Sequence, residues 1–465
     1  MVYTKNNNYE LHLGMMQEVL PKLPAESVDA VITDPPYELG FMGKSWDNTG
    51  VAFQKQTWEE CLRVLKPGGY LLAFGGTRTF HRIACAIEDA GFEIRDTIMW
   101  LYGSGFPKSM NIGKGIEARE KFGNACTRNK RLVEQECDGE SRVVKQPNNG
   151  VLGTIVEATR KDYVPGTDSA KEWAGWGTCL KPAYEPIIVA RKPFQGSLVD
   201  NILEYRVGGL NIDECRIGLK DSEVKHGGFG AAKTGFQKGI GNSGDADYKC
   251  EWVENTEGRF PANVLLTYGE TDEQEVCGGM PYTKGDSRET KPTYESGYWG
   301  AATSVESGAL YNDEGSAARY FYCAKASKRD RDEGLDLFEN KVKVFNGKSD
   351  QSSKDIKDVE QRFTTVAKNI HPTVKPVALM QYLIRLVCPK GSIILDPFNG
   401  SGSTGKACMY ENKDRSADYY YIGVEMTEEY LPISKARLDF AINDSEPLVV
   451  DETGTVVKTT KISLW

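Results

Sequence analysis

The first hundred residues alternate between strand-like and helix-like spacing of hydrophobic positions. The β-branched run at 27–33 predicts a buried strand that ends at Asp34-Pro35-Pro36-Tyr37, because proline cannot continue a central strand. The apolar face of residues 53–65 predicts a helix, which Lys66-Pro67-Gly68-Gly69 ends. The same spacing predicts a helix over 80–90 and strands over 70–74 and 96–102. Strands separated by helices indicate a parallel α/β sheet.

This alternation stops between Gly103 and about Lys368, where Gly, Asn, Asp, Ser and charged residues dominate. Two strands are expected there, at 184–190 and 259–266, and long loops at 219–250 and 280–315. The alternation then returns. It predicts a helix over 377–387, a strand over 392–395, a helix from about 404, a strand over 420–424 and a helix to about 440. One α/β sheet is therefore expected to receive strands from both ends of the chain.

A glycine-rich loop at 396–405 lies between a predicted strand and a predicted helix. Gly400, Gly402 and Gly405 fit the pattern G-x-G-x-x-G, and Glu425 ends the next strand. Because glycines have no Cβ atom, a ligand can approach the backbone of this loop closely. The Glu425 carboxylate can accept hydrogen bonds from both hydroxyls of a ribose. Glycine runs of this kind also occur as simple turns, which is the structural alternative. Asp396 at the strand tip would repel a pyrophosphate but suits the cationic groups of S-adenosylmethionine. The loop therefore favours this methyl donor over a dinucleotide.

The motif Asp34-Pro35-Pro36-Tyr37 suits chemistry on an exocyclic amino group of a nucleobase. The lone pair of that nitrogen is delocalised into the ring and is a poor nucleophile. A carboxylate and a rigid backbone carbonyl that accept its two N–H bonds favour the pyramidal, nucleophilic form, and Tyr37 offers a face for stacking. A Pro-Pro turn with a capping Asp is the structural alternative. A base modified in this way must first leave the duplex.

On these motifs and on His371-Pro372-Thr373-Val374-Lys375-Pro376, the chain resembles the amino-group (N6-adenine and N4-cytosine) DNA methyltransferases of bacteria and phages. The resemblance covers about 1–195 and 368–440, in the subgroup whose catalytic motif precedes its cofactor motif. It implies a circularly permuted Rossmann-like methyltransferase sheet with a large inserted target-recognition region. Residues 392–395, 420–424, 10–13 and 28–33 would then be strands one to four, with 96–102 and 184–190 as the final antiparallel hairpin.

The resemblance also implies the site residues. Asp34, Pro35, Pro36 and Tyr37 would be catalytic, and the segment at 371–376 would line the methionine side of the donor. The residues implied to bind S-adenosylmethionine are His371, Thr373, Lys375, Asp396, Phe398, Gly400, Ser401, Gly402, Thr404 and Glu425. The family usually has Gly-Asp after strand three, whereas this chain has Gly14-Met15, so one contact to the donor adenine is in doubt.

The resemblance divides the chain into four parts. Residues 1–193 form the catalytic half with an insertion at about 103–182, 194–367 recognise the target, 368–445 form the cofactor half, and 446–465 are a tail. Phage-type members share a block with Trp173, Trp176 and residues 181–186, interpreted as packing of the hairpin or as an apolar wall near the base. The predicted DNA contacts are Lys44 and Trp46 in a loop over the flipped base, and Arg319, Lys325, Lys328 and Arg329, whose alternative is a solvated helix face.

Composition narrows the class further. The chain has 465 residues, of which 40% are hydrophobic, so two or three domains with real cores are expected and wholesale disorder is excluded. No run of about 18 apolar residues or apolar leader is present, which predicts a cytoplasmic protein of a bacterial or phage-infected cell. Eleven scattered cysteines without C-x-x-C and four histidines support neither a disulfide framework nor a metal site. The net charge of −9 requires that DNA binding rely on a local basic patch.

The sequence therefore predicts an S-adenosylmethionine-dependent DNA methyltransferase acting on adenine N6 in double-stranded DNA. Asp rather than Ser at position 34 favours adenine by resemblance, and cytosine N4 methylation is the alternative. A nicotinamide-dependent dehydrogenase, a catalytically silent DNA-binding regulator, and RNA or protein methylation are more distant alternatives. A homodimer and a cognate restriction endonuclease stay open as partners.

Overall fold

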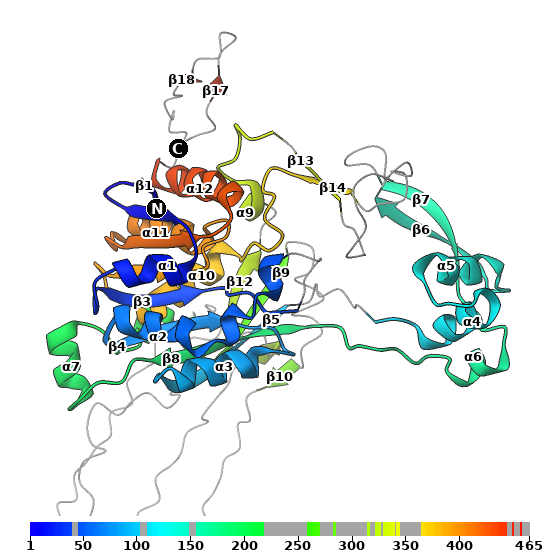
Figure 1. Cartoon of the computed structure of the whole chain (residues 1–465), viewed down its shortest axis with the longest axis horizontal. Coiled ribbons are helices and arrows are strands. Elements are labelled where there is room, and N and C mark those ends of the chain that lie inside the picture. The colour runs from blue at the N-terminus through cyan, green and yellow to red at the C-terminus, as the bar shows by residue number, and fades with distance from the viewer. Residues whose placement is uncertain are drawn as a thin grey trace, which may run out of the picture.

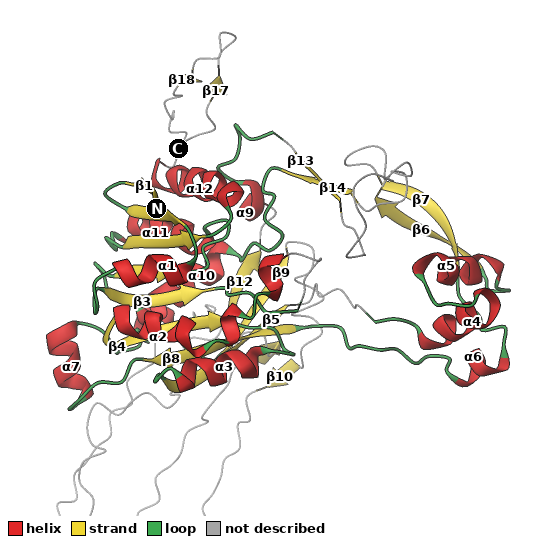
Figure 2. Ribbon diagram, in the orientation of Figure 1, coloured by secondary structure: helices red, strands yellow, loops and turns green. Residues whose placement is uncertain are grey.

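A ten-stranded mixed sheet forms the centre of the structure, a computed structural model (Figure 1, Figure 2). The strand order is β1-β2-β16-β15-β3-β4-β8-β5-β9-β12. The bounds are β1 Val2–Lys5, β2 Tyr9–Leu13, β3 Val28–Thr33, β4 Leu65–Phe74, β5 Glu93–Tyr102, β8 Tyr184–Arg191, β9 Val264–Gly269, β12 Tyr322–Ala326, β15 Ile393–Asp396 and β16 Tyr420–Glu425. The structure describes residues 1–39, 45–102, 109–147, 155–217, 258–269, 282–284, 314–316, 321–326, 329–339, 341–344, 364–443, 449–450 and 456–457.

The two ends of the chain meet in the middle of this sheet. Ile394 of β15 pairs with Tyr421 of β16 on one side and with Ala30 of β3 on the other, all in parallel. Strands β2, β16, β15 and β3 lie side by side in this order, and β8 runs antiparallel between β4 and β5 as the expected hairpin requires. The circular permutation itself, which concerns the chain order in other methyltransferases, stays a prediction.

Helices cover both faces of the sheet, which explains why its strands are continuously apolar. Alternate strand residues point to opposite faces: Tyr70 and Leu72 belong to one buried cluster, Leu71 and Ala73 to the other. The first cluster packs beneath α10 (Val377–Val387), α11 (Ser403–Arg415) and α12 (Leu431–Asn443). The second packs beneath α1 (Met16–Val19), α2 (Lys55–Val64) and α3 (Phe80–Asp89). The parallel strands are therefore held between two helical layers.

Two boundaries differ from the sequence prediction. Leu65, expected to end a helix, already pairs with Val28 as the first residue of β4, and residues 66–69 bulge out before pairing resumes at Tyr70. The strand expected at 259–266 begins only at Val264, because Pro261 has no N–H to donate to a ladder.

Residues 109–183, between β5 and β8, form a small folded unit that projects from the sheet (Figure 1). The sequence analysis named no individual helix or strand here, so these elements were missed. Its elements are α4 Ile112–Phe122, α5 Thr127–Glu136, β6 Ser141–Pro147, β7 Ile155–Lys161 and α6 Asp168–Glu172. Buried Glu117 accepts hydrogen bonds from Tyr163 Oη (2.7 Å) and Gly166 N (3.0 Å), so polar contacts organise a unit with few apolar positions. Trp173 and Trp176 lie in this unit with their rings 5.2 Å apart, and they are 39% and 60% exposed.

The remaining described elements are short. They are α7 Leu198–Tyr205, α9 Arg329–Asp332, the strand pairs β10 Tyr282–Lys284 with β11 Glu314–Ser316, β13 Lys341–Val344 with β14 Thr364–Ala367 and β17 Val449–Val450 with β18 Val456–Val457, and single 3-10 turns at Leu20–Lys22, Ser45–Asn48, Val51–Phe53, Asp213–Cys215 and Glu428–Tyr430. None of the helices in the described ranges has the length and apolar character needed to cross a membrane.

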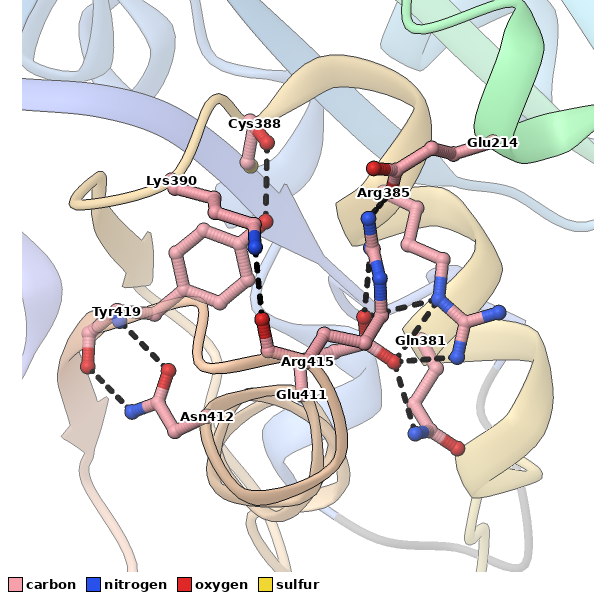
Figure 3. Close-up of polar contacts among 9 residues, drawn as sticks. All are labelled: Glu214, Gln381, Arg385, Cys388, Lys390, Glu411, Asn412, Arg415 and Tyr419. Carbon is pink, nitrogen blue, oxygen red and sulfur yellow. Dashed lines mark hydrogen bonds and ion pairs between the residues drawn. The ribbon is translucent and has the colours of Figure 1, made fainter.

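A buried carboxylate joins helices α10 and α11 (Figure 3). Glu411 of α11 is fully buried and accepts hydrogen bonds from Gln381 and Arg385 of α10 and from Arg415 of its own helix. Arg415 also pairs with Glu214 of the turn Asp213–Cys215, which follows β8 and α7 in the chain. Because both carboxylate oxygens are matched by donors, this cluster holds α10 against α11.

Candidate active site

The carboxyl ends of β2, β16, β15 and β3 meet at one edge of the sheet, because these four strands are parallel. Gly14, Glu425, Asp396 and Asp34 stand at or directly after these ends, and a cavity opens between them. Helix α11 starts at the same edge. Ligands of open α/β sheets bind in this position, so the topology alone marks the cavity as the candidate site.

The predicted catalytic motif lines this cavity with all four residues, Asp34, Pro35, Pro36 and Tyr37. Tyr37 Oη donates a hydrogen bond of 2.8 Å to Glu185 of β8. Lys375 Nζ donates to Asp34 Oδ2 at 2.6 Å and to Tyr37 Oη at 3.2 Å. The sequence grouped Lys375 with the donor-binding residues, whereas the structure puts its ammonium against the catalytic motif.

Lys375 is buried, with its ammonium surrounded by charge and aromatic rings. Its Nζ lies 3.3 Å from Glu185, in addition to its contact with Asp34, and 4.9 Å from the centre of the Phe74 ring. Burial disfavours the charged form, but the two carboxylates outweigh this and raise the pKa of Lys375 above its ordinary value. Burial and the same carboxylates also raise the pKa of Tyr37, so its hydroxyl keeps its proton at neutral pH.

Asp396 closes the inner end of the cavity. Its Oδ1 accepts hydrogen bonds from Thr33 Oγ1 (2.6 Å) and Phe398 N (3.1 Å), and its Oδ2 accepts from Thr404 Oγ1 (2.7 Å). Burial raises the pKa of Asp396 to about 6, while these hydrogen bonds act in the opposite direction. Since Thr33 and Asp396 are 363 residues apart in the sequence, their contact joins the end of β3 to the glycine loop.

Glu425 organises the glycine loop. Its Oε2 accepts from Gly400 N at 2.8 Å and its Oε1 from Thr427 N at 2.7 Å. Burial raises the pKa of Glu425 to about 7, against the effect of these backbone donors. Gly400 has a φ of 52°, and a Cβ there would lie 2.8 Å from His371 Nε2. The loop therefore needs glycine where it meets the histidine.

The segment 371–375 forms the opposite wall of the cavity. The His371 ring lies 4.7 Å from the Tyr430 ring in an edge-to-face arrangement, and its Nδ1 contacts the carbonyl of Thr373. Arg331 of α9 donates to the His371 carbonyl at 3.0 Å. This guanidinium therefore holds the segment from outside the cavity wall, through its backbone carbonyls.

The cavity brings together nearly all of the predicted donor-binding residues. Those that line it are His371, Thr373, Lys375, Asp396, Phe398, Gly400, Ser401, Thr404 and Glu425. Gly402 is the exception: it precedes α11 with a φ of 74°, and a Cβ there would lie 2.3 Å from Ser434 Oγ. Its role is close packing of the loop on α12 rather than lining the cavity.

None of the six predicted DNA contacts has a side chain that the structure describes. Lys44, Arg319 and Lys328 lie outside the described residues. Trp46 lies in the turn Ser45–Asn48, Lys325 in β12 and Arg329 in α9, where only the backbone is described. These six residues therefore remain predictions.

Sequence reasoning missed several residues that line the cavity. Glu185 was noted only within a shared block, and its neighbour Tyr184 begins the strand that carries it to the catalytic motif. Met15, Met426 and Tyr430 add apolar surface next to the strand ends. The only available signal was a methionine close to the end of each strand: Met426 directly follows β16, and Met15 follows β2 after Gly14. The described residues contain no group of three or more His, Cys, Asp or Glu placed to hold a metal ion.

Comparison with known families decides the class. The family model of N6/N4 methyltransferases, described as DNA methylase, matches residues 28–193 and 253–436. The chain belongs to this DNA methylase family. The match includes the catalytic motif, the segment 371–375, the glycine loop and Glu425.

Individual relatives match shorter stretches. The type II methyltransferase M.HpaI of Haemophilus parainfluenzae is 37% identical over 98 residues, which are 20% of this chain and 31% of the relative. The DNA adenine methyltransferase YhdJ of Escherichia coli (strain K12) is 33% identical over 97 residues, again 20% and 31%. The chain thus spans about a third of the length of these methylases. The solved PvuII DNA methyltransferase (cytosine-N4-specific) aligns with 13% identity and a TM-score of 0.39 over 95% of this chain and 97% of that chain.

Proposed function

We propose that this methylase transfers a methyl group from S-adenosylmethionine to the exocyclic N6 of an adenine flipped out of double-stranded DNA. One observation carries the proposal: a catalytic-type carboxylate, Asp34, and the two loop carboxylates Asp396 and Glu425 line a single cavity. Attack on a methyl donor requires the amino group and the donor to meet within one enclosed space. The cavity provides a base side and a donor side for this encounter.

The residues on the donor side fit S-adenosylmethionine. Gly400 leaves room for close approach to the loop backbone, and Glu425 offers carboxylate oxygens at the end of β16, where ribose hydroxyls can donate. Met15, Phe398 and Tyr430 offer apolar surface for an adenine ring. When bound, S-adenosylmethionine supplies an electrophilic methyl group on a cationic sulfur. The negative charge of Asp396 and Glu425 favours that cation and disfavours the pyrophosphate of a nicotinamide dinucleotide.

The base side fits an exocyclic amine. Asp34 and the Pro35 carbonyl would accept its two N–H bonds and direct the nitrogen lone pair toward the methyl group. Tyr37 would stack on the base, with its ring orientation set by the hydrogen bond from its hydroxyl to Glu185. The positive charge that develops on the amine would be stabilised by the adjacent carboxylate.

Adenine is the proposed base, and cytosine N4 is the second candidate because its amine has the same chemistry. Asp rather than Ser at position 34 supports adenine by the family resemblance, and the relative YhdJ is named an adenine methyltransferase. We further propose that residues 194–367 recognise the DNA sequence, with Arg319, Lys325, Lys328 and Arg329 among the contacts. Such a substrate implies action in the cytoplasm of a bacterial or phage-infected cell; a homodimer and a cognate restriction endonuclease are additional proposed partners.

Expression of the chain in a methylation-free bacterial host, followed by modification-sensitive long-read sequencing, tests the proposal. We expect N6-methyladenine within one short sequence context and none in cells that express the Asp34→Ala variant. N4-methylcytosine in the same experiment would transfer the proposal to the second candidate. Unmodified DNA, together with purified chain that fails to bind S-adenosylmethionine in calorimetry, would refute both.

A further inference from the structure

The two oxygens of the Asp34 carboxylate have different surroundings. Oδ2 accepts a hydrogen bond of 2.6 Å from Lys375, whereas Oδ1 is buried and has no hydrogen-bond partner among the described residues. A buried carboxylate oxygen without a donor is costly, and such groups concentrate where a ligand completes the hydrogen bonding. Asp34 lines the cavity, and Oδ1 is its carboxylate oxygen that is left without a donor.

Three acceptors hold the Lys375 ammonium in place. These are Asp34 Oδ2 at 2.6 Å, Tyr37 Oη at 3.2 Å and Glu185 Oε2 at 3.3 Å. An ammonium group has three N–H donors, so the acceptors match its hydrogen-bonding capacity. Tyr37 donates in turn to Glu185, which closes the network. The orientation of Asp34 therefore depends on β8 as well as on its own strand.

The network also carries one excess negative charge. Asp34 and Glu185 are two carboxylates around a single ammonium, and Lys375 is buried, with only 7% of its surface exposed. When an amine attacks the methyl group, positive charge moves from sulfur to the amine nitrogen. A preorganised, net negative cluster next to that nitrogen stabilises the charge that develops.

We infer that Lys375 and Glu185 are a positioning pair for Asp34: Lys375 holds Oδ2 so that Oδ1 receives the amino group, and Glu185 holds Lys375. This inference rests on the proposed amino-group transfer and deepens it, because it assigns Lys375 to the base side instead of the donor side. It applies equally to adenine and cytosine.

Two variants test the pair in the full-length chain. Lys375→Met should lower kcat about 100-fold, the effect of losing one preorganised polar partner, with donor affinity unchanged within about twofold. It also leaves the carboxylates of Asp34 and Glu185 without the ammonium between them, and their repulsion raises the pH at which both are ionised. The acidic limb of the plot of kcat/KM against pH should therefore move to higher pH. The double variant Lys375→Met/Glu185→Gln removes this repulsion and should return the limb toward its original position. A merely structural role would not produce this reversal.

Controls separate folding from positioning. Lys55→Met, at an exposed position of α2, should leave activity and the pH profile unchanged. Lys375→Arg keeps a cation and should retain more activity than Lys375→Met at equal thermal stability, which keeps the test valid if the methionine variant fails to fold. Full kcat in Lys375→Met, a loss explained wholly by weaker donor binding, or an arginine variant no better than methionine would overturn the inference. A wild-type chain without transfer to DNA would overturn the proposed function and this inference together, whereas unaffected variants of an active wild type overturn only the inference.

Discussion

Asp34 and Lys375 form an ion pair of 2.6 Å although 341 residues separate them in the chain. One residue follows a strand from the amino-terminal part, and the other belongs to the segment that leads into α10. The pair therefore exists only when the two parts of the chain share one sheet. This contact, the Thr33–Asp396 hydrogen bond and the cavity between them make the candidate active site a product of both chain ends.

Replacement of Asp34 by Ala should separate catalysis from donor binding. We expect kcat to fall at least about 100-fold, because the principal acceptor for the amine is lost, while the Kd for S-adenosylmethionine changes less than about twofold. Single-turnover transfer of a labelled methyl group and calorimetry measure the two quantities. Asp89→Ala, at the exposed end of α3, is the matched control. Retained transfer in Asp34→Ala would contradict the mechanism.

Donor binding should strengthen as the pH rises through the pKa of Glu425. This carboxylate has a pKa of about 7 because of burial, and only its ionised form can accept both hydroxyls of a ribose. We expect about tenfold tighter binding at pH 8 than at pH 6. Glu425→Gln should bind weakly and with little pH dependence, whereas Glu428→Gln, at an exposed position nearby, should behave like wild type. Calorimetry across this range would refute the role of Glu425 if both variants follow the wild-type curve.

The same pKa predicts how stability depends on pH. The pKa of Glu425 is higher in the folded chain than its ordinary value of 4.5, so the folded state binds the extra proton. Its contribution to stability is therefore present below pH 4.5 and lost as the pH rises through about 7. Urea unfolding at several pH values should show a smaller loss over this interval for Glu425→Gln than for wild type. Equal losses in wild type and Glu425→Gln would show that groups other than Glu425 determine the pH dependence of stability over this interval.

Two glycines separate backbone strain from close packing. Gly391 and Gly402 both have left-handed φ values, 82° and 74°, but only Gly402 meets a neighbour where a Cβ would stand. Gly391→Ala should lower the free energy of unfolding by about 1 kcal/mol through strain alone. Gly402→Ala should cost about 2–4 kcal/mol, because the new methyl group also displaces Ser434. Chemical denaturation measures the difference, and equal losses would mean that α12 shifts without cost.

Loss of the Glu411 carboxylate should destabilise the packing of α10 on α11. Glu411→Ala removes the partner of Arg385 and Arg415, and breaking a buried ion pair by removing one member typically costs about 3–5 kcal/mol. Glu88→Ala, at an exposed position of α3, should change stability by less than about 0.5 kcal/mol. Urea unfolding compares the two, and a Glu411→Ala variant as stable as wild type would show that solvent reaches the cluster.

The local part of the fold could be predicted because local spacing determines it. The helix at Val377–Val387, the strand that ends before Asp34 and the strand that ends at Asp396 follow from short apolar runs with Pro and Gly at their ends. The numbering of strands one to four and the antiparallel hairpin came from the family resemblance instead of from spacing, and the order of the strands across the sheet came from the structure. The helices of the insertion were missed, because their buried centre is built on polar contacts of Glu117 and shows no strong apolar periodicity.

The sequence by itself determined the motifs, the residue types at the strand ends and the kind of ligand they suit. Only the tertiary structure decided which side chains meet. Lys375, predicted to bind the methyl donor, contacts Asp34 instead. Gly402, predicted to bind the donor, packs on α12, and Glu185 of β8 contacts Tyr37 in the site. The physical reason is that a motif specifies backbone and chemistry within a few residues, whereas ion pairs and packing depend on strands brought together from opposite ends of the chain.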